Sequence, residues 1–421
     1  MSGLRFAMIT TFYPPYNFGG DGMGILRLSQ ALVRRGHDVT VIHDADAYLT
    51  LAGKPPAASF ADDGVQIVSL RSSLGPVSNL LTQQTGRPVV HGARIRRELE
   101  RRDIDVTIFH NVSLVGGPGV LSMGRGVSLY MAHEHWLVCP SHVLWRHGRE
   151  VCTGRECLRC VVHYRRPPQA WRYTGFLEQQ AGHIDAFIAM SQFSRDKHRE
   201  FGFPRDMEVV PYFLPDTDSA PTPAADASPH GRPYFLFVGR LEKIKGLDDV
   251  IPVFSRFDRA DLLIAGDGEY GEVLKALAAG NPRVRFLGRV APADLSRYYR
   301  HAAALLVPSV CFETFGIIII EAFRQGTPVV ARRIGPFPEI LNHAGGGDLF
   351  ETAAELETAL HRYLDEPDRR ERLGHAGLQA FRQTWSESAV LPRFLQVVRR
   401  AAQRRGEQRI AALAAEEMVQ A

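Results

Sequence analysis

Two carboxylates, Glu313 and Glu321, flank a Phe-Gly turn that leads into four consecutive isoleucines. Residues 305–309 before them read as a buried strand, and 326–328, a Gly-Thr-Pro, predict the end of a helix that begins at Gly316. The unpaired amides and the positive dipole end of such a helix favour a phosphate or pyrophosphate. Because carboxylates accept hydrogen bonds from hydroxyls, the segment predicts a sugar-phosphate site.

The same segment has a simpler interpretation. Four isoleucines also fit a fully buried strand with Glu313 and Glu321 as solvated flanks, because a short apolar run does not separate strand from helix by periodicity. The neighbouring motifs must therefore decide between the two.

A second candidate site follows the predicted strand 234–238. The next loop carries Arg240, whose guanidinium can bind phosphate with two donors, and Lys245, a mobile point charge. A solvated basic loop is the competing interpretation. However, ligands of open parallel sheets gather outside the carboxyl ends of the strands. Small residues at 266–268 and at Gly288 follow the next two strands, so this edge is predicted to admit a ligand.

The first predicted strand, 5–10, ends in a glycine-rich loop. Gly19 and Gly20 lie between it and a helix that runs to Gly36, where a ligand can approach the backbone without meeting a Cβ. The loop lacks GxGxxG spacing and a Walker lysine, so it predicts neither a dinucleotide nor an ordinary triphosphate site. A plain flexible turn is an equally good interpretation.

Histidines end two later strands of the first half. His133 and His135 end one strand with a glutamate between them, and His110 and Asn111 end the strand before it. A single histidine at a strand end is more often structural. Two histidines and a glutamate at one edge favour a functional site as strongly as a structural one.

Strand and helix signals alternate along all 421 residues, which predicts parallel sheets covered by helices on both faces. The length and a hydrophobic content of 45% indicate two α/β domains. Residues 215–233 are rich in Pro, Ala, Ser and Asp and read as the linker. A second series of strands and helices restarts at 234.

These motifs resemble glycosyltransferase family 4 in order and spacing over nearly the whole chain. The segments that carry the resemblance are Gly239-Arg240-Leu241, Lys245-Gly246, Gly266-Asp267-Gly268, Pro308-Ser309 and the Glu-x7-Glu stretch. The resemblance implies a GT-B fold, with two Rossmann-like parallel-sheet domains facing a cleft. An acceptor-side domain would span 1–214 and a nucleotide-sugar domain 234–384, while helices in 385–421 would return to the N-terminal domain.

The resemblance also implies how the donor is held. Arg240 and Lys245 would neutralise the donor pyrophosphate, and the amides around Phe315, Gly316 and Ile317 would complete its cradle. Charge that develops on the leaving diphosphate would be stabilised electrostatically, so no catalytic metal is expected. Retention of configuration is implied by the family, through same-face attack within an ion pair.

The remaining donor contacts are implied in the same way. Glu321 would hold the ribose hydroxyls, Glu313 the hydroxyls of the transferred sugar, and the backbone near Val290 the base. Gly19 and Gly20 would approach the donor phosphates from the first domain. Two-carboxylate hydrolysis needs both groups beside one scissile bond, so Glu313 and Glu321 are not interpreted as a hydrolase pair.

On the acceptor side, His133 matches the family histidine beside the donor sugar and is also a candidate catalytic residue with Glu313, Arg240 and Lys245. His135, His110 and Asn111 are assigned to the acceptor side.

Four of the five cysteines fall in one short stretch, at Cys139, Cys152, Cys157 and Cys160. The spacing predicts a structural zinc ion with four thiolate ligands, which would tie an insertion at about 136–168 to the strand of His133. An iron-sulfur cluster and free or transiently oxidised thiols are the alternatives, and a nearby histidine could replace one thiolate. We expect the insertion to shape the acceptor pocket.

Charge and hydropathy limit the partners. The formal net charge of +4 is small and balanced along the chain, which argues against nucleic acid. Without a secretory signal or a run of ~20 apolar residues, a cytoplasmic protein is expected. Basic stretches at 94–102 and 164–173 fit a solvated face, an anionic acceptor, or peripheral contact with anionic lipid at the inner face of the membrane.

The sequence therefore predicts a metal-independent retaining glycosyltransferase that uses a nucleotide-diphosphate sugar, with UDP or GDP preferred. Its acceptor would be a hydroxyl or other nucleophile of a glycan or a small molecule. The alternatives are a metal- or redox-regulated sugar-nucleotide-binding protein and a GT-B epimerase without transfer activity. The acceptor, the base and sugar of the donor, and the oligomeric state are not specified by these motifs.

Overall fold

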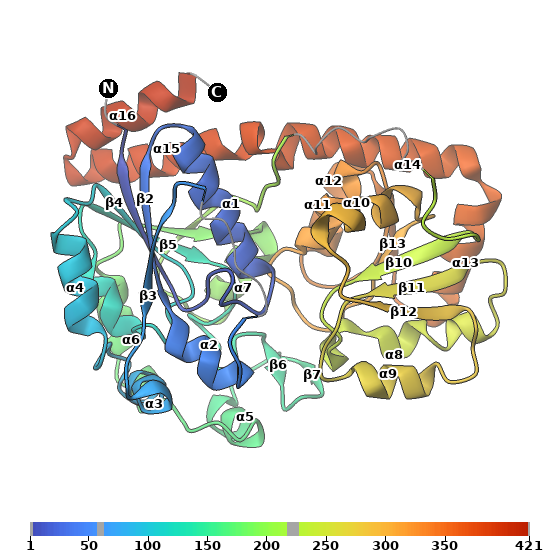
Figure 1. Ribbon diagram of the computed structural model, residues 1–421, viewed down its shortest axis with the longest axis horizontal. Coiled ribbons are helices and arrows are strands. Elements are labelled where there is room, and N and C mark those ends of the chain that lie inside the picture. Colours follow the sequence, from blue (N-terminus) through green and yellow to red (C-terminus); the bar gives the residue numbers. More distant parts are fainter. Residues whose placement is uncertain (1–2, 57–62, 217–226, 420–421) are drawn as a thin grey trace. The chain divides into compact units, whose positions relative to one another are not determined.

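The computed structural model describes residues 3–56, 63–216 and 227–419. By its internal contacts the chain forms two compact α/β units (Figure 1). Unit 1 consists of Met1–Tyr212 together with Val390–Ala421, and unit 2 consists of Phe213–Ala389. The helices at the end of the chain thus belong mostly to unit 1. Residues 217–226 of the predicted linker at 215–233 lie outside the described residues.

Unit 1 contains a seven-stranded parallel sheet in the order β3-β2-β1-β4-β5-β8-β9. Its strands are β1 Arg5–Thr10, β2 Asp38–Asp44, β3 Gln66–Leu70, β4 Val106–Phe109, β5 Val127–Ala132, β8 Ala186–Ala189 and β9 Met207–Val209. In register, Phe6 of β1 pairs with Val39 and Val106 on its two sides. The central strands are buried on both faces, as expected of a parallel sheet covered by helices.

The helices of unit 1 lie on both faces of this sheet. They are α1 Gly20–Arg34, α2 Ala45–Ala52, α3 Gly75–Thr85, α4 Gly92–Glu100, α5 Cys157–His163, α6 Phe176–Ala181, α7 Gln192–Glu200, α15 Glu387–Arg405 and α16 Gln408–Val419. Figure 1 shows α4 and α6 on one side of the sheet and α1 and α2 on the other. The cysteine-rich insertion contains a short hairpin whose two strands have two residues each, β6 Trp145–Arg146 and β7 Glu150–Val151.

Unit 2 contains a six-stranded parallel sheet in the order β12-β11-β10-β13-β14-β15. Its strands are β10 Tyr234–Val238, β11 Asp261–Ala265, β12 Val284–Gly288, β13 Leu305–Val307, β14 Val329–Arg332 and β15 Gly347–Phe350. Its helices are α8 Leu247–Val250, α9 Gly271–Leu277, α10 Pro292–His301, α11 Ile317–Arg324, α12 Phe337–Ala344, α13 Ala353–Asp365 and α14 Pro367–Ala380. Helices α10 to α12 cover one face and α8 and α9 the other (Figure 1).

Both sheets reverse their strand order at a central pair, β1 with β4 in unit 1 and β10 with β13 in unit 2. Ligand sites of open α/β sheets form outside the carboxyl ends of the strands at such a reversal. The loops after these four strands are therefore the places where each unit can bind a ligand. They carry Gly19, His110, Lys245 and Glu313.

The isoleucine run lies in α11, so the buried-strand interpretation of this segment is wrong. Gly316 precedes the helix with φ 101°, a conformation that strongly favours glycine. Among the described residues, no helix is long and apolar enough to cross a bilayer.

Candidate functional site

The loops after β10 and β13 meet in an ion pair. Lys245 Nζ lies 2.5 Å from Glu313 Oε1, and the Ser309 hydroxyl donates a hydrogen bond to the same oxygen at 3.1 Å. Burial opposes both charges, but the mutual attraction and the hydrogen bonds outweigh it. They hold the pKa of Lys245 above, and that of Glu313 below, its ordinary value. Both groups are therefore charged at neutral pH.

Arg240 adds a cation at the same strand end. Its side chain is 53% exposed, and Nη1 lies 2.8 Å from Glu242 Oε1. An ion pair this exposed contributes only about 0–1 kcal/mol, so an arriving anion can compete with Glu242 for the guanidinium. The site thus holds Arg240 in a weak contact and Lys245 in a strong one.

Gly316 sets the start of α11 behind these charges. A Cβ at Gly316 would lie 2.9 Å from Cε1 of Phe337, closer than side chains approach one another. Only glycine combines this space with the observed φ, so the helix can begin directly after the loop that carries Glu313. Phe315 is buried and Ile317 is half-buried. Because α11 begins after the carboxyl end of β13, its first amides lie at that edge of the sheet.

Glu321 is separated from Glu313 in its contacts. Its Oε2 accepts a hydrogen bond from the Tyr299 hydroxyl of α10 at 3.1 Å, whereas Glu313 is bonded to Lys245. The two carboxylates thus have different partners, as two groups that hold separate parts of one ligand would. Val290, assigned to the base, follows β12 and is half-buried.

In unit 1, His133 lies in a buried hydrogen-bonded row. Its Nε2 is 2.8 Å from His110 Nδ1, and its Nδ1 is 2.5 Å from the Tyr212 hydroxyl. Burial lowers the pKa of His133 to about 3 and that of His110 well below its ordinary value, so both rings are neutral at pH 7. A substrate contact through the His133 ring would have to replace one of these bonds.

The other predicted groups of unit 1 occupy structural positions. His135 is buried with its ring 5.3 Å from that of His198, so its ring is not presented to solvent. Asn111 Oδ1 accepts hydrogen bonds from the amide and hydroxyl of Ser113, which fixes the turn after β4. Gly19 caps α1 with extended backbone, and Gly20 begins the helix.

The four clustered cysteines line one small cavity in the insertion after β5. Cys157 and Cys160 lie on α5, Cys139 follows the strand of His133, and Cys152 follows β7. The fifth cysteine, Cys311, is buried in unit 2. The structure thus brings together the four residues predicted as metal ligands.

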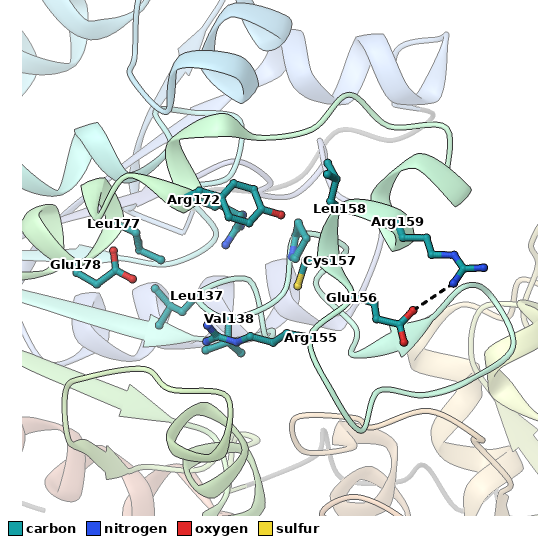
Figure 2. A pocket seen from close by; sticks show the side chains of 12 residues that line it. Leu137, Val138, Arg155, Glu156, Cys157, Leu158, Arg159, Arg172, Leu177 and Glu178 are labelled. Carbon is teal, nitrogen blue, oxygen red and sulfur yellow. Dashed lines mark ion pairs between the residues drawn. The ribbon is translucent and has the colours of Figure 1, made fainter.

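A larger cavity of about 600 Å³ adjoins this cluster (Figure 2). Its lining combines three arginines, two glutamates and several apolar side chains; the named residues are Leu137, Val138, Pro140, Arg155, Glu156, Cys157, Leu158, Arg159, Arg172, Tyr173, Leu177 and Glu178. Cys157 belongs to the lining of both cavities. The sequence predicted an acceptor pocket near this insertion, and Arg172 and Tyr173 of the basic stretch 164–173 lie in the lining of this cavity.

One further polar group escaped sequence reasoning. Among the described residues, one group of three potential metal ligands has its ligand atoms within 4.8 Å of one another, and it consists of Asp44, Asp46 and His91. Their hydrogen bonds explain the arrangement, because Asp44 caps α2 and Asp46 Oδ2 binds His91 and the amide and hydroxyl of Ser72. We interpret this group as a structural anchor between α2 and β3.

Comparison with known families identifies the chain. Residues 18–215 match the family model described as Glycosyltransferase Family 4, and residues 219–380 match that of Glycosyl transferases group 1. The chain belongs to glycosyltransferase family 4. This family 4 chain is accordingly a glycosyltransferase, which confirms the family predicted from its motifs.

Relatives and solved structures extend over almost the full length of this family 4 glycosyltransferase. It is 28% identical to phosphatidyl-myo-inositol mannosyltransferase of Mycobacterium leprae, over 91% of this chain and 94% of that enzyme. It is 26% identical to glycogen synthase of Mycobacterium tuberculosis, over 89% and 90% of the two chains.

The fold is likewise shared with solved structures. Sucrose-phosphate synthase from Thermosynechococcus elongatus superposes with a TM-score of 0.71 at 18% identity, covering 94% of this chain and 98% of that chain. HepE from Anabaena, solved in complex with UDP-glucose, gives a TM-score of 0.65 at 16% identity, over 96% and 100%. The predicted GT-B fold is thereby confirmed.

Proposed function

We propose that this glycosyltransferase transfers a sugar from a nucleotide-diphosphate donor to an acceptor nucleophile, with retention of configuration and without a catalytic metal. The observation that carries the proposal is the Lys245–Glu313 pair beside Arg240 and the start of α11. It gathers cations and helix amides at the strand reversal of unit 2. The UDP-glucose complex of HepE, a protein of the same fold, supports a nucleotide-sugar donor.

In this proposal Arg240 and Lys245 stabilise the charge that develops on the leaving diphosphate, together with the first amides of α11. Glu313 serves two purposes, because it orients Lys245 and offers its second carboxylate oxygen to hydroxyls of the transferred sugar. Glu321 binds the ribose hydroxyls. Such groups act by position and charge, so the mechanism assigns no proton transfer to them.

A thermal-shift screen with UDP-, GDP-, ADP- and TDP-sugars tests the donor class. A ligand at ~100 times its Kd stabilises the folded protein by about 2.7 kcal/mol, which gives a measurable rise in Tm. The Lys245→Met variant should lose this shift. Lys243→Met is the matched control, because Lys243 lies on the same turn and is exposed. If no nucleotide sugar raises Tm, or if both variants respond like the wild type, the proposed donor site is refuted.

The acceptor is proposed to bind the cavity of about 600 Å³ in unit 1. Charged side chains of both signs beside leucines suit a hydroxylated acceptor with an apolar portion. Tyr173 lines this cavity and is 64% exposed, so its ring is available to a ligand. Tyr173→Ala should raise the acceptor KM several-fold and leave the donor KM unchanged; a changed donor KM alone would contradict the assignment.

Peripheral contact with an anionic membrane is proposed through α3, a helix whose apolar face is exposed. Leu74, Val77 and Leu80 are 49%, 51% and 51% exposed. The face of α3 that packs on the rest of unit 1 is instead polar and consists of Ser78, Asn79 and Thr82. An amphipathic helix in this orientation presents its apolar face to a partner rather than to its own core.

Cations next to α3 favour a lipid surface as that partner. Gln83 of α3 donates a hydrogen bond to the Pro167 carbonyl, directly after the exposed Arg165 and Arg166. Apolar side chains flanked by arginines suit the interface of an anionic bilayer. A relative at 28% identity carries phosphatidyl-myo-inositol in its name, which is consistent with a lipid-linked acceptor.

Flotation with vesicles tests this surface. The wild type should bind vesicles that contain an anionic phospholipid and bind neutral vesicles weakly, while the Val77→Asp/Leu80→Asp variant should lose binding. Val273→Asp/Leu277→Asp is the matched control, because these side chains on α9 are 48% and 44% exposed. Equal binding of both double variants would contradict a role for α3.

A further inference from the structure

The four clustered cysteines of the insertion surround one small cavity. Cys139, Cys152, Cys157 and Cys160 come from a turn, a strand end and a short helix, yet all four line one cavity of about 20 Å³. A space of this size holds about one water-sized sphere. It therefore suits a single ion better than an iron-sulfur cluster, which adds inorganic sulfides to its metals.

The backbone around this cavity is held in conformations that need support. Of the six non-glycine residues with positive φ among the described residues, four lie in the insertion: His142, Leu144, His147 and Arg165. Each such residue costs on the order of 1 kcal/mol or more and persists only where its surroundings fix it. The regular elements of the insertion are a short hairpin and the seven-residue α5, and isolated backbone hydrogen bonds such as that from the Cys152 amide to the Leu144 carbonyl join them. A covalent or metal crosslink would add to this support.

The charge beside the cysteines points to a metal rather than to disulfides. Arg172 is partly buried with Nη2 lacking a hydrogen-bond partner, and it lines the larger cavity together with Cys157. It stacks 4.6 Å from the Trp171 ring centroid, and it has no carboxylate partner among the described residues. Neutral thiols or disulfides leave this cation without a counter-charge. A tetrathiolate metal centre carries a net negative charge and supplies one.

One cysteine sulfur already accepts a backbone hydrogen bond. The amide of His147 donates to Cys160 Sγ at 3.4 Å. The histidines that could replace a cysteine are not among the residues that line this cavity. His142 Nδ1 is bonded to Glu134 at 2.7 Å, and His147 Nε2 lies 3.7 Å from Glu156.

We propose that Cys139, Cys152, Cys157 and Cys160 bind one structural zinc ion with four thiolate ligands. Binding displaces one proton from each thiol, and no redox step is involved. With Zn–S bonds of about 2.3 Å the sulfurs of a tetrahedral site lie ~3.8 Å apart. Among the described residues no three of them lie within 4.8 Å of one another, so the thiols close inward when the ion binds.

The zinc would fix one wall of the larger cavity. Cys157, Pro140 and Glu156 line both the cysteine cavity and the cavity of about 600 Å³. A single ion that joins Cys139 to α5 would hold these residues in one arrangement. Zinc is thus a positioning element for the cavity wall and takes no part in the chemistry of transfer.

Metal analysis of the purified full-length protein tests the site. We expect about one zinc per chain by inductively coupled plasma mass spectrometry. We also expect cobalt, added to metal-depleted protein, to give the visible absorption of a tetrahedral thiolate centre. Cys157→Ser and Cys160→Ser should lose both signals. Cys311→Ser, which removes the buried cysteine of unit 2, should keep full metal content.

A measurement on the wild type covers the case in which the serine variants do not fold. Titration with a thiol reagent, followed with a chromophoric chelator, should release zinc in step with modification of the clustered thiols and before Cys311 reacts, because Cys311 is only 3% exposed. Protein that takes up no zinc, zinc that survives modification of these thiols, or iron with sulfide in place of zinc would each overturn the proposal. Donor-induced thermal shifts in unit 2 are read separately, so this result does not depend on the proposed transfer activity.

Discussion

The Lys245–Glu313 pair should be strongly coupled in the folding stability of unit 2. At 2.5 Å and an effective dielectric of ~20, the Coulomb attraction between the two charges is about 7 kcal/mol. Desolvation offsets much of this, since the side chains are only 21% and 24% exposed. We therefore expect a coupling free energy of about 2–3 kcal/mol, and each single variant should be destabilised because it leaves one partly buried charge unpaired.

A double-mutant cycle measures this coupling. Lys245→Met, Glu313→Gln and the double variant are unfolded in urea at pH 7 beside the wild type. The same cycle on Arg256–Glu357, an exposed pair at 3.0 Å in unit 2, serves as control and should give less than ~1 kcal/mol. A coupling below ~0.5 kcal/mol for Lys245–Glu313 would refute the reasoning.

The coupling should depend on pH in a defined direction. The pKa of Glu313 is lowered in the folded protein, so its contribution is complete above the ordinary glutamate pKa and is lost as pH falls through the lowered value. The pKa of Lys245 is raised, so its contribution is complete below the ordinary lysine pKa and is lost as pH rises through the raised value. The cycle should therefore be flat around neutrality and should collapse in acid.

Three further predictions concern single residues. Glu321→Ala should weaken donor binding about tenfold by calorimetry, because a charge-assisted hydrogen bond of ~1.5 kcal/mol is lost. Glu313→Ala should mainly lower kcat. Wild-type kinetics in both variants would contradict these roles. Gly316→Ala should cost more than ~1 kcal/mol by urea unfolding, since its Cβ would meet Phe337, while Gly326→Ala, at positive φ but with open space, should cost less. Burial lowers the pKa of His198 from 6.5 to about 4, so the folded state favours the neutral ring. The resulting stability is complete above pH 6.5 and is about 2 kcal/mol smaller at pH 5. The His198→Asn variant should show a flatter dependence of unfolding free energy on pH, and an unchanged dependence would contradict this prediction.

Much of the fold could be predicted because its signals are local. Alternating strands and helices predict parallel sheets. Each candidate ligand-binding residue follows a strand, so the topology places these residues at one edge of a sheet. The sequence could not separate a strand from a helix over Ile317–Ile320, because both bury four isoleucines. In the structure this segment is a helix, because β13 ends at Val307 and the next strand that pairs with β13 is β14.

The partners of individual side chains were beyond the sequence. Lys245 and Glu313 were each assigned to the donor, but their mutual contact depends on β10 and β13 being neighbours, although two strands separate them in the chain. The bond of His133 to Tyr212 joins residues 79 apart, and no local pattern marks the tyrosine. The inverted orientation of α3 likewise depends on what packs beneath it, which periodicity does not reveal.

Unit 1 is made of two segments that lie far apart in the chain, so its fold depends on contacts between them. Arg409 of α16 forms an ion pair with the buried Asp105, and Arg400 of α15 pairs with Glu208, so the last helices close contacts begun by the first half of the chain. Unit 2 is instead built from one continuous segment of the chain. Truncation after residue 389 would therefore remove one segment of unit 1 and leave the whole segment of unit 2 in place.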